Sequence, residues 1–282
     1  MPPIKLVAVD IDGTLLNSQF NVSKANVRAL LEAHRAGIHV VLATGRRHTF
    51  AMPIAERLGF QPHIISSNGA MACAPSGEVI TSTFMPRRVA RALLNEMEPF
   101  AALAVLTFNR NGRGALVLQS RDASSPRLRG WLEKNAEYVV EVDPLQDSLT
   151  EDPIQIMYCA DIKQMEHVLA LLTSTPAAKD VTCSNTRYAH RDMSLVDVLP
   201  RGCTKGHALS QLAASLGVAA DEIAAIGDNG NDREMLAFAG HAFVVENGVE
   251  ELKRCGWTVV RSNDDDGVAH ALELALRAAV EA

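Results

Sequence analysis

The sequence predicts an α/β fold in which a Rossmann-like core, built on a parallel sheet, is interrupted by an inserted α+β domain. Three observations support this prediction. Strand-like and helix-like segments alternate from Ile4 to about residue 65, the same alternation returns from Thr204, and the section between them has a pattern of helices and hairpins. Regular alternation favours a parallel sheet with helices on both faces. We therefore expect the core to comprise residues 1–83 and 190–282, and the inserted domain residues 84–189.

The bulk composition is that of a globular protein. The chain has 282 residues, which is enough for two domains, and 48% of them are hydrophobic while 21% are charged. A net charge of −6 gives no electrostatic reason to expect nucleic acid or an anionic membrane as a partner. The first residues lack the pattern of a secretion signal, and no apolar run approaches the roughly 20 residues that cross a bilayer. The five cysteines form no C-x-x-C pair, so we expect reduced thiols in a cytoplasmic protein, either a monomer or a homodimer.

The first core segment is expected to alternate three strands with two helices. The strands are expected at 4–9, 38–42 and 63–65, and the helices at 22–36 and 49–58. Apolar residues recur at helical spacing in the first of these helices. Gly37 and Gly59 stand directly after the two helices, where a left-handed backbone conformation favours glycine.

The inserted section and the second core segment differ in pattern. In the inserted section we expect helices at 86–98, 126–135 and 162–174, and strands at 103–108, 115–119, 138–142, 153–159, 180–187 and 194–198. The segment Asn109-Arg110-Asn111-Gly112 has the composition of a hairpin connection. After Thr204 we expect helices at 205–216 and 267–280, with a further helix after residue 232, and strands at 223–226, 241–245 and 257–260.

Two carboxylates follow the first strand, in the segment Asp10-Ile11-Asp12-Gly13-Thr14. Residues two apart on an extended strand point the same way, and ligands of open α/β sheets bind beyond the carboxyl ends of the strands. Two like charges this close are costly unless a cation or a proton relieves them. Carboxylate oxygens favour a hard cation such as Mg²⁺. For a single aspartate, a helix cap or an Asx-turn would be the preferred interpretation, but we consider it the minority interpretation for this pair.

A third carboxylate occupies the corresponding place after another strand. Asp228 follows the strand expected at 223–226, and Asp232 can either reach the same region or cap the next helix. A polar turn that caps a helix would by itself account for this segment. Its combination with Asp10 and Asp12 favours a metal site instead.

Groups suited to phosphate lie at two further positions. A carboxylate beside Mg²⁺ is a poor base but a workable nucleophile towards phosphorus, and phosphoryl transfer needs positive charge and oriented donors. Thr44 and Gly45 follow the second expected strand, and Lys205 opens a helix whose first amides are free to bind an anion. Taken singly, a helix-capping turn and a solvated lysine are the simpler interpretations of these two segments.

Five segments, in this order, resemble the haloacid dehalogenase superfamily, and among its members the Cof-type phosphatases, whose larger cap is inserted between the second and third motifs. They are Val9-Asp10-Ile11-Asp12-Gly13-Thr14-Leu15, Leu42-Ala43-Thr44-Gly45-Arg46, Ser67-Asn68-Gly69-Ala70, Lys205-Gly206 and Gly227-Asp228-Asn229-Gly230-Asn231-Asp232. The tail from Ser262 to Ala269 also resembles that group. Where relatives usually have Met-Gly-Asn-Ala, this chain has Val245-Glu246-Asn247-Gly248, and Glu246 could either alter substrate preference or point to solvent.

The resemblance implies a role for each matched residue. Asp10 would be the nucleophile that becomes aspartyl-phosphate and would also bind Mg²⁺. Asp12 would bind the metal through its backbone carbonyl, protonate the leaving alcohol and then activate the hydrolytic water. Thr44, Gly45 and Lys205 would hold the phosphoryl group. Asp228 would complete the metal site, and Asp232 would support that site without touching the metal. Asn231 would lie near the phosphate or a metal-bound water, and Arg46 is a candidate contact to the substrate.

The resemblance thus implies a Mg²⁺-dependent phosphatase that acts on a small phosphorylated metabolite, either a sugar phosphate or a phosphorylated cofactor. The inserted cap would select that substrate. A hexose phosphomutase of the same superfamily is an alternative with the same nucleophile, but it must exclude water. A non-catalytic phosphometabolite-binding protein is a third, and the presence of all the expected reactive groups speaks against it.

Overall fold

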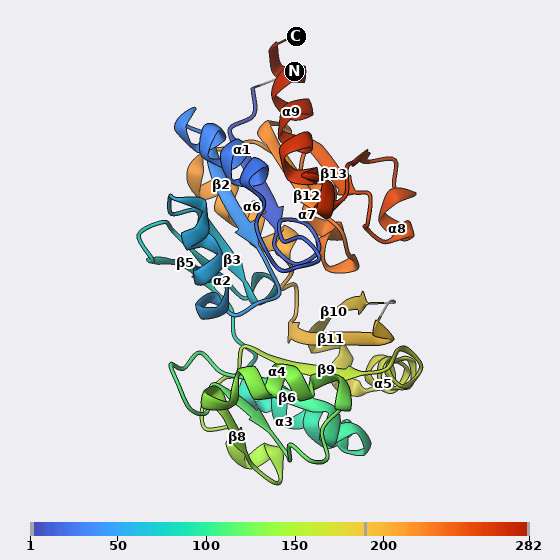
Figure 1. The fold of residues 1–282 in the computed structure, drawn as a ribbon. Coiled ribbons are helices and arrows are strands. Elements are labelled where there is room, and N and C mark those ends of the chain that lie inside the picture. Colours follow the sequence, from blue (N-terminus) through green and yellow to red (C-terminus); the bar gives the residue numbers. More distant parts are fainter. Residues whose placement is uncertain (1–2, 189–190, 281–282) are drawn as a thin grey trace. The chain divides into compact units, whose positions relative to one another are not determined.

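The computed structural model describes residues 3–188 and 191–280, and the chain divides into two compact units (Figure 1). The first unit combines Met1–Ser82 with Thr204–Ala282, and the second is Thr83–Cys203. The second division falls after residue 203, whereas it was expected from the sequence after residue 189. The difference arises because strand β11 (Met193–Pro200) pairs with strands β10 (Val181–Tyr188) and β9 (Gln155–Ala160) of the inserted unit.

An eight-stranded sheet, in the order β14-β13-β12-β1-β2-β3-β4-β5, forms the centre of the first unit. Its strands are β1 (Leu6–Asp10), β2 (His39–Ala43), β3 (His63–Ser66), β4 (Met71–Cys73), β5 (Val79–Ser82), β12 (Ile223–Gly227), β13 (His241–Val245) and β14 (Thr258–Val260). The six strands from β14 to β3 run parallel, as expected, and β4 and β5 add an antiparallel hairpin at one edge. This hairpin was not predicted from the sequence, because its strands have only three and four residues and show little periodicity.

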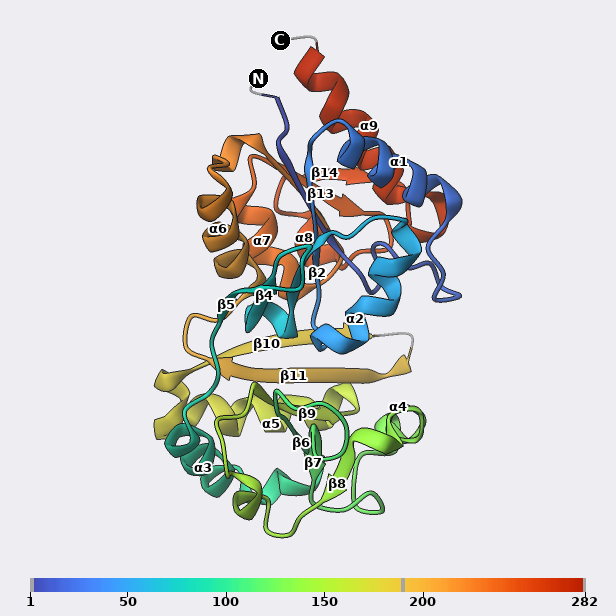
Figure 2. The same cartoon turned by 90° about the vertical axis from the view of Figure 1, so that its left-hand side faces the viewer.

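Helices cover both faces of this sheet (Figure 2). They are α1 (Lys24–Arg35), α2 (His48–Ala55), α6 (Lys205–Leu216), α7 (Arg233–Phe238), α8 (Glu250–Lys253) and α9 (Gly267–Val280). Helices α1, α2 and α9 pack on one face, and α6 and α7 pack on the other. The central strands are therefore buried on both sides, which explains why their sequences are continuously apolar. The pairing register places Asp10 beside Ala43 of β2, and Val9 beside Ile226 of β12, so the carboxyl ends of these three strands meet.

The inserted unit has a six-stranded sheet of its own, in the order β10-β11-β9-β6-β7-β8. Its remaining strands are β6 (Ala104–Thr107), β7 (Leu116–Leu118), β8 (Val139–Glu141), β9 (Gln155–Ala160) and β10 (Val181–Tyr188), and its helices are α3 (Arg87–Glu96), α4 (Arg129–Lys134) and α5 (Ile162–Ser174). Helices α3 and α5 pack on one face of the sheet and α4 packs on the other. Strands β6 and β7 pair antiparallel, so the hairpin expected at Asn109–Gly112 is present.

Tyr158 of β9 offers a test of the core of the inserted unit. Its side chain is fully buried among the residues that contact α3 and α5, and among the described residues its hydroxyl has no hydrogen-bond partner. A buried hydroxyl without a partner lowers the stability of the folded state. We expect Tyr158→Phe to raise the free energy of unfolding by about 1 kcal/mol, as measured by urea denaturation. A fall in stability would show instead that the hydroxyl has a bound partner, such as a buried water.

Candidate active site

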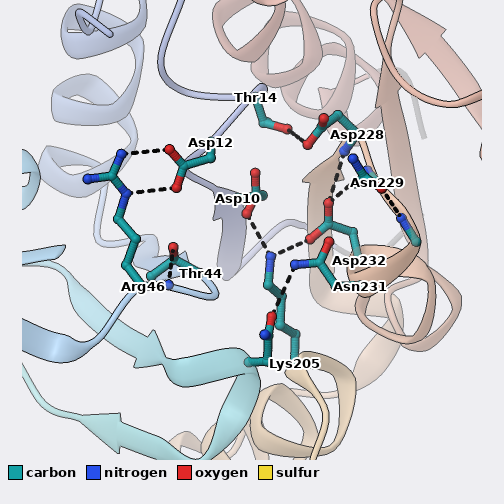
Figure 3. Close-up of polar contacts among 12 residues, drawn as sticks. Asp10, Asp12, Thr14, Thr44, Arg46, Lys205, Asp228, Asn229, Asn231 and Asp232 are labelled. Carbon is teal, nitrogen blue, oxygen red and sulfur yellow. Dashed lines mark hydrogen bonds and ion pairs between the residues drawn. The ribbon is translucent and has the colours of Figure 1, made fainter. Parts of the chain in front are cut away.

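The candidate site lies where the carboxyl ends of β2, β1 and β12 meet. Asp10 is the last residue of β1, Thr44 follows β2 directly, and Asp228 follows β12 directly. Asp10 and Asp228 are 4% and 8% exposed, and Thr44 is fully buried. The structure brings these residues together with Asp12, Arg46, Lys205, Asn231 and Asp232 (Figure 3). Such a gathering of side chains is what the parallel alignment of neighbouring strands produces.

Lys205 is a fully buried cation between two carboxylates. Its Nζ donates to Asp10 Oδ1 at 2.6 Å and to Asp232 Oδ1 at 2.7 Å. Burial alone would lower the pKa of Lys205, but the attraction of the two carboxylates outweighs burial and raises this pKa above its ordinary value. The side chain is held at the first turn of α6, whose N-cap Thr204 accepts a hydrogen bond from the His207 amide. The solvated surface lysine considered from the sequence is therefore excluded.

Asp232 uses both of its carboxylate oxygens within the protein. Oδ1 accepts from Lys205, and Oδ2 accepts from the backbone amides of Asp228 at 3.0 Å and of Asn229 at 3.1 Å. The side chain is fully buried. Asp232 therefore fixes both the ammonium group and the loop that carries Asp228. Its position next to the other carboxylates agrees with a supporting role rather than with a free ligand.

Asp10 has one committed oxygen and one uncommitted oxygen. Oδ1 is bound to Lys205, whereas Oδ2 is buried and has no hydrogen-bond partner among the described residues. Burial and the nearby Asp232 charge raise the pKa of Asp10 to about 7, although Lys205 opposes this change. Burial and the charge of Asp10 likewise raise the pKa of Asp228 well above its ordinary value. The folded protein thus concentrates more negative charge here than Lys205 neutralises.

The same group of carboxylates fits a hard divalent cation. Asp10, Asp228 and Asp232 each offer an oxygen atom, and these atoms lie within 4.8 Å of one another. Oxygen-only donors suit Mg²⁺ rather than a soft metal, and a cation at this place would relieve the mutual repulsion. Since Asp232 is saturated by Lys205 and two amides, the carboxylates of Asp10 and Asp228 are the groups best placed to bind the ion.

The turn after β1 packs directly on Asp228. The hydroxyl of Thr14 donates to Asp228 Oδ1 at 3.2 Å. Gly13 has a φ of +89°, and a Cβ atom at this position would lie 2.5 Å from Asp228 Oδ2. Both the backbone conformation and the close approach therefore require glycine.

Asp12 is paired with Arg46. The guanidinium donates from Nε to Oδ2 at 2.7 Å and from Nη2 to Oδ1 at 2.6 Å, and both side chains are about one-third exposed, at 31% and 29%. This two-point geometry matches the planar fork of arginine to a carboxylate. Arg46 was expected from the sequence as a candidate substrate contact, and its pairing with Asp12 was not predicted. In Figure 3 the Arg46–Asp12 pair and the Lys205–Asp232 pair lie on opposite sides of Asp10.

The residues expected to bind phosphate lie in the same region, together with Asn68, which belongs to a matched segment of the sequence but was given no role. The Thr44 hydroxyl accepts from the Arg46 amide at 3.0 Å, and Gly45 lies against the Asn68 side chain, where a Cβ would be 3.2 Å from its amide nitrogen. Asn231 Nδ2 donates to Asn68 Oδ1 at 3.0 Å. Asn68 is buried with a φ of +52°, a conformation that asparagine tolerates better than most residues. The sequence could have predicted that Asn68 lies in the site, because Ser67-Asn68-Gly69 directly follows a strand.

The excess of negative charge leads to a prediction about pH and metal. The pKa of Asp10 is about 7 in the folded protein, above its ordinary value of 3.8, so between these two pH values the folded state binds more protons than the unfolded state. Without metal, this carboxyl therefore makes the free energy of unfolding fall as the pH rises through that window. A bound cation removes the repulsion, so we expect Mg²⁺ to raise the melting temperature more at about pH 8 than at about pH 5. Thermal denaturation with Mg²⁺ or with EDTA measures this difference, and an equal rise at both pH values would contradict it.

The comparisons with known proteins agree with this geometry. Residues 7–272 match the model of the haloacid dehalogenase-like hydrolase family. The chain is 33% identical to "Phosphatase YwpJ" of Bacillus subtilis strain 168, over 96% of this chain and 99% of that protein. It is 27% identical to an "HMP-PP phosphatase" of Cronobacter sakazakii, over 88% of this chain and 86% of the relative. A solved haloacid dehalogenase-like hydrolase from B. subtilis superposes with a TM-score of 0.79 at 29% identity and covers 96% of this chain and 99% of its own.

Within the part of the chain that the structure describes, none of the helices combines the length and the apolar character needed to span a membrane.

Proposed function

The chain belongs to the haloacid dehalogenase-like hydrolase family and is a phosphatase, and on this premise we propose that it hydrolyses a small phosphorylated metabolite through an aspartyl-phosphate on Asp10, with Mg²⁺ as cofactor. The resemblance to the Cof-type phosphatases seen in the sequence is confirmed by these matches. The observation that carries the proposed chemistry is the uncommitted, buried Oδ2 of Asp10. Lys205 holds the carboxylate in place by donating to Oδ1, and Oδ2 has no hydrogen-bond partner among the described residues.

The proposed reaction has two steps. In the first, Asp10 Oδ2 forms a bond to phosphorus while the bond from phosphorus to the ester oxygen breaks, and Asp12 gives a proton to the departing alcohol. In the second, water attacks the same phosphorus, Asp12 accepts a proton from that water, and the bond to Asp10 breaks to release inorganic phosphate. Arg46 donates one hydrogen bond to each oxygen of Asp12, which orients this carboxylate and leaves a second lone pair on each oxygen for the leaving group or the water.

The negative charge of the reacting phosphoryl group needs matching positive charge and donors. Lys205 supplies an ammonium group beside Asp10, and Thr44, Gly45 and Asn231 supply a hydroxyl, a backbone amide and a side-chain amide. Such groups act most strongly in a site with little water, and Lys205 and Thr44 are fully buried. We assign these four residues to the phosphoryl oxygens.

The metal is proposed to bind to Asp10 and Asp228, with the backbone carbonyl of Asp12 as a third ligand. Bound there, Mg²⁺ supplies positive charge to the phosphoryl oxygens and to the transition state. Asp232 keeps Lys205 and the Asp228 loop in position and does not contact the ion.

The inserted unit is proposed to select the substrate. The residues assigned above recognise phosphate and metal, and they do not discriminate between a sugar phosphate and a phosphorylated cofactor. One similar protein is named as acting on HMP-PP and another, 26% identical, on 5-amino-6-(5-phospho-D-ribitylamino)uracil. A panel of phosphorylated metabolites of both classes, ranked by kcat/KM, would identify the preferred leaving group.

The proposed function is tested by phosphate release from a generic aryl phosphate. We expect release in the presence of Mg²⁺, loss of activity with EDTA, and recovery when Mg²⁺ is added back in excess. No release by the wild-type protein with Mg²⁺ would contradict the hydrolase. Transfer of the phosphoryl group back to a hexose in place of release to water would indicate the phosphomutase alternative.

A further inference from the structure

Two segments near the site have no part in the proposed reaction. The first is the turn Glu246–Val249 after β13, and the second is the tail segment Ser262–Asp266 after β14. Strand β13 pairs with β12 in parallel, with Val244 beside Gly227, so the turn lies next to Asp228. Both segments therefore stand at the same edge of the sheet as the proposed metal ligands.

The turn is bound to the backbone of Asp228. The amide of Val249 donates to the Asp228 carbonyl at 2.8 Å. A Cβ added at Gly248 would lie 3.1 Å from that carbonyl oxygen, which shows how closely the turn approaches. The main chain of Asp228 is thus held at its amide by Asp232 and at its carbonyl by Val249.

The turn is also bound to the loop after β1. Asn247 Nδ2 donates to the Gly13 carbonyl at 2.7 Å, and Asn247 Oδ1 accepts from the Asn263 amide at 2.8 Å. Asn263, which is buried, also donates from Nδ2 to the Leu16 carbonyl at 2.8 Å. Because Oδ1 of Asn247 is occupied by a donor, its amide can present only Nδ2 to Gly13, and the orientation of the side chain is fixed.

We propose that Asn247 is a positioning residue that sets the affinity of the site for Mg²⁺ through Gly13 and Thr14. The hydrogen bond from Asn247 fixes the peptide group between Gly13 and Thr14. That peptide places the Thr14 hydroxyl on Asp228 Oδ1 and the Gly13 Cα against Asp228 Oδ2. Both oxygens of a metal ligand are therefore located by a loop that Asn247 anchors. The proposal rests on the metal site of the proposed function.

The chemistry of the ion makes such anchoring matter. Mg²⁺ requires nearly ideal octahedral geometry at short distances, so a small displacement of a ligand oxygen weakens binding. Asn247 is itself exposed, and its removal therefore leaves no cavity in the core. We thus expect a change in metal affinity without a matching loss of stability.

The experiment compares Asn247→Ala with wild type by thermal denaturation of the full chain during a titration with Mg²⁺. In EDTA the two melting temperatures should agree closely. The Mg²⁺ concentration that gives half of the full rise in melting temperature should be roughly 5-fold higher for the variant, as expected for the loss of one hydrogen bond that acts on the site.

With an aryl phosphate, the variant should be slow at limiting Mg²⁺ and should approach the wild-type kcat at saturating Mg²⁺. Glu251→Gln, an exposed change just beyond the same turn, serves as the matched control and should follow the wild-type curve.

Two outcomes would overturn the proposal in different ways. If Asn247→Ala lowers the melting temperature equally at every Mg²⁺ concentration, with an unchanged midpoint of the titration, then Asn247 acts only on stability. If the wild-type protein itself shows no rise with Mg²⁺, the proposed metal site fails, and the role of Asn247 fails with it.

Discussion

Asp10→Asn is expected to lower kcat for aryl phosphate hydrolysis by about 10⁴-fold or more, while the protein stays folded. The amide that replaces the carboxylate is not a nucleophile towards phosphorus, so the proposed first step is lost. The same change removes one of the charges that repel each other near Lys205. Because burial raises the pKa of Asp10 to about 7, its ionised form is unfavourable in the metal-free protein, and the variant should be at least as stable as wild type at about pH 8.

Opposite effects on activity and stability distinguish this result from simple unfolding. Steady-state kinetics with Mg²⁺ measures the activity, and urea denaturation in EDTA measures the stability. Asp122→Asn, at an exposed position of the inserted unit, makes the same chemical change away from the site and should alter neither. Unchanged phosphate release by Asp10→Asn would refute the assignment of the nucleophile.

Lys205→Met is expected to lower the free energy of unfolding by about 3–5 kcal/mol near pH 8, and to abolish activity. Lys205 lies between Asp10 and Asp232 with no exposure to solvent, so its removal leaves two buried carboxylates without their cation. The loss should shrink at about pH 5, because the carboxyl of Asp10, whose pKa burial already raises, then takes up a proton. Urea denaturation at the two pH values measures both quantities.

A second lysine in the same chain provides the matched control. Lys5 forms an ion pair with Glu222 at 2.6 Å, the same distance as Lys205 to Asp10, but the Lys5 side chain is 53% exposed. Exposed pairs contribute little to stability because water and salt screen them. Lys5→Met should therefore leave the denaturation midpoint nearly unchanged. If Lys5→Met and Lys205→Met lower the free energy of unfolding equally, then burial does not make the ion pairs of Lys205 stronger than the exposed pair of Lys5.

The sequence predicted the parts of the site that depend on position along strands. Asp10, Thr44 and Asp228 were placed from the ends of apolar strands, because parallel strands align their carboxyl ends whatever lies between them in the chain. Helices α6 and α9 and strand β13 have the boundaries expected from periodicity and terminating residues. The β4–β5 hairpin was missed because strands this short have no useful period.

The missed parts depend on side chains that meet only in the folded protein. Arg46 and Asp12 are 34 residues apart, and Asn247 is 234 residues from Gly13. Local sequence does not predict that an arginine will pair with a carboxylate rather than with a substrate. Nor does it predict that an asparagine after β13 will bind a backbone carbonyl after β1, from which β12 separates it in the sheet. Such contacts follow from the sheet order and from the loops between strands, which periodicity does not specify.

The central claim is that the phosphoryl group passes through Asp10. It is tested most directly by rapid acid quenching of the enzyme during turnover of a labelled aryl phosphate, followed by peptide mapping. For the wild-type protein we expect the label on the peptide that contains Asp10. The amount of label should be larger for Asp12→Ala, because this variant cannot activate the hydrolytic water. Asp10→Asn should carry no label. Absence of a labelled peptide from both wild type and Asp12→Ala during measurable phosphate release, or label on a residue other than Asp10, would contradict the account.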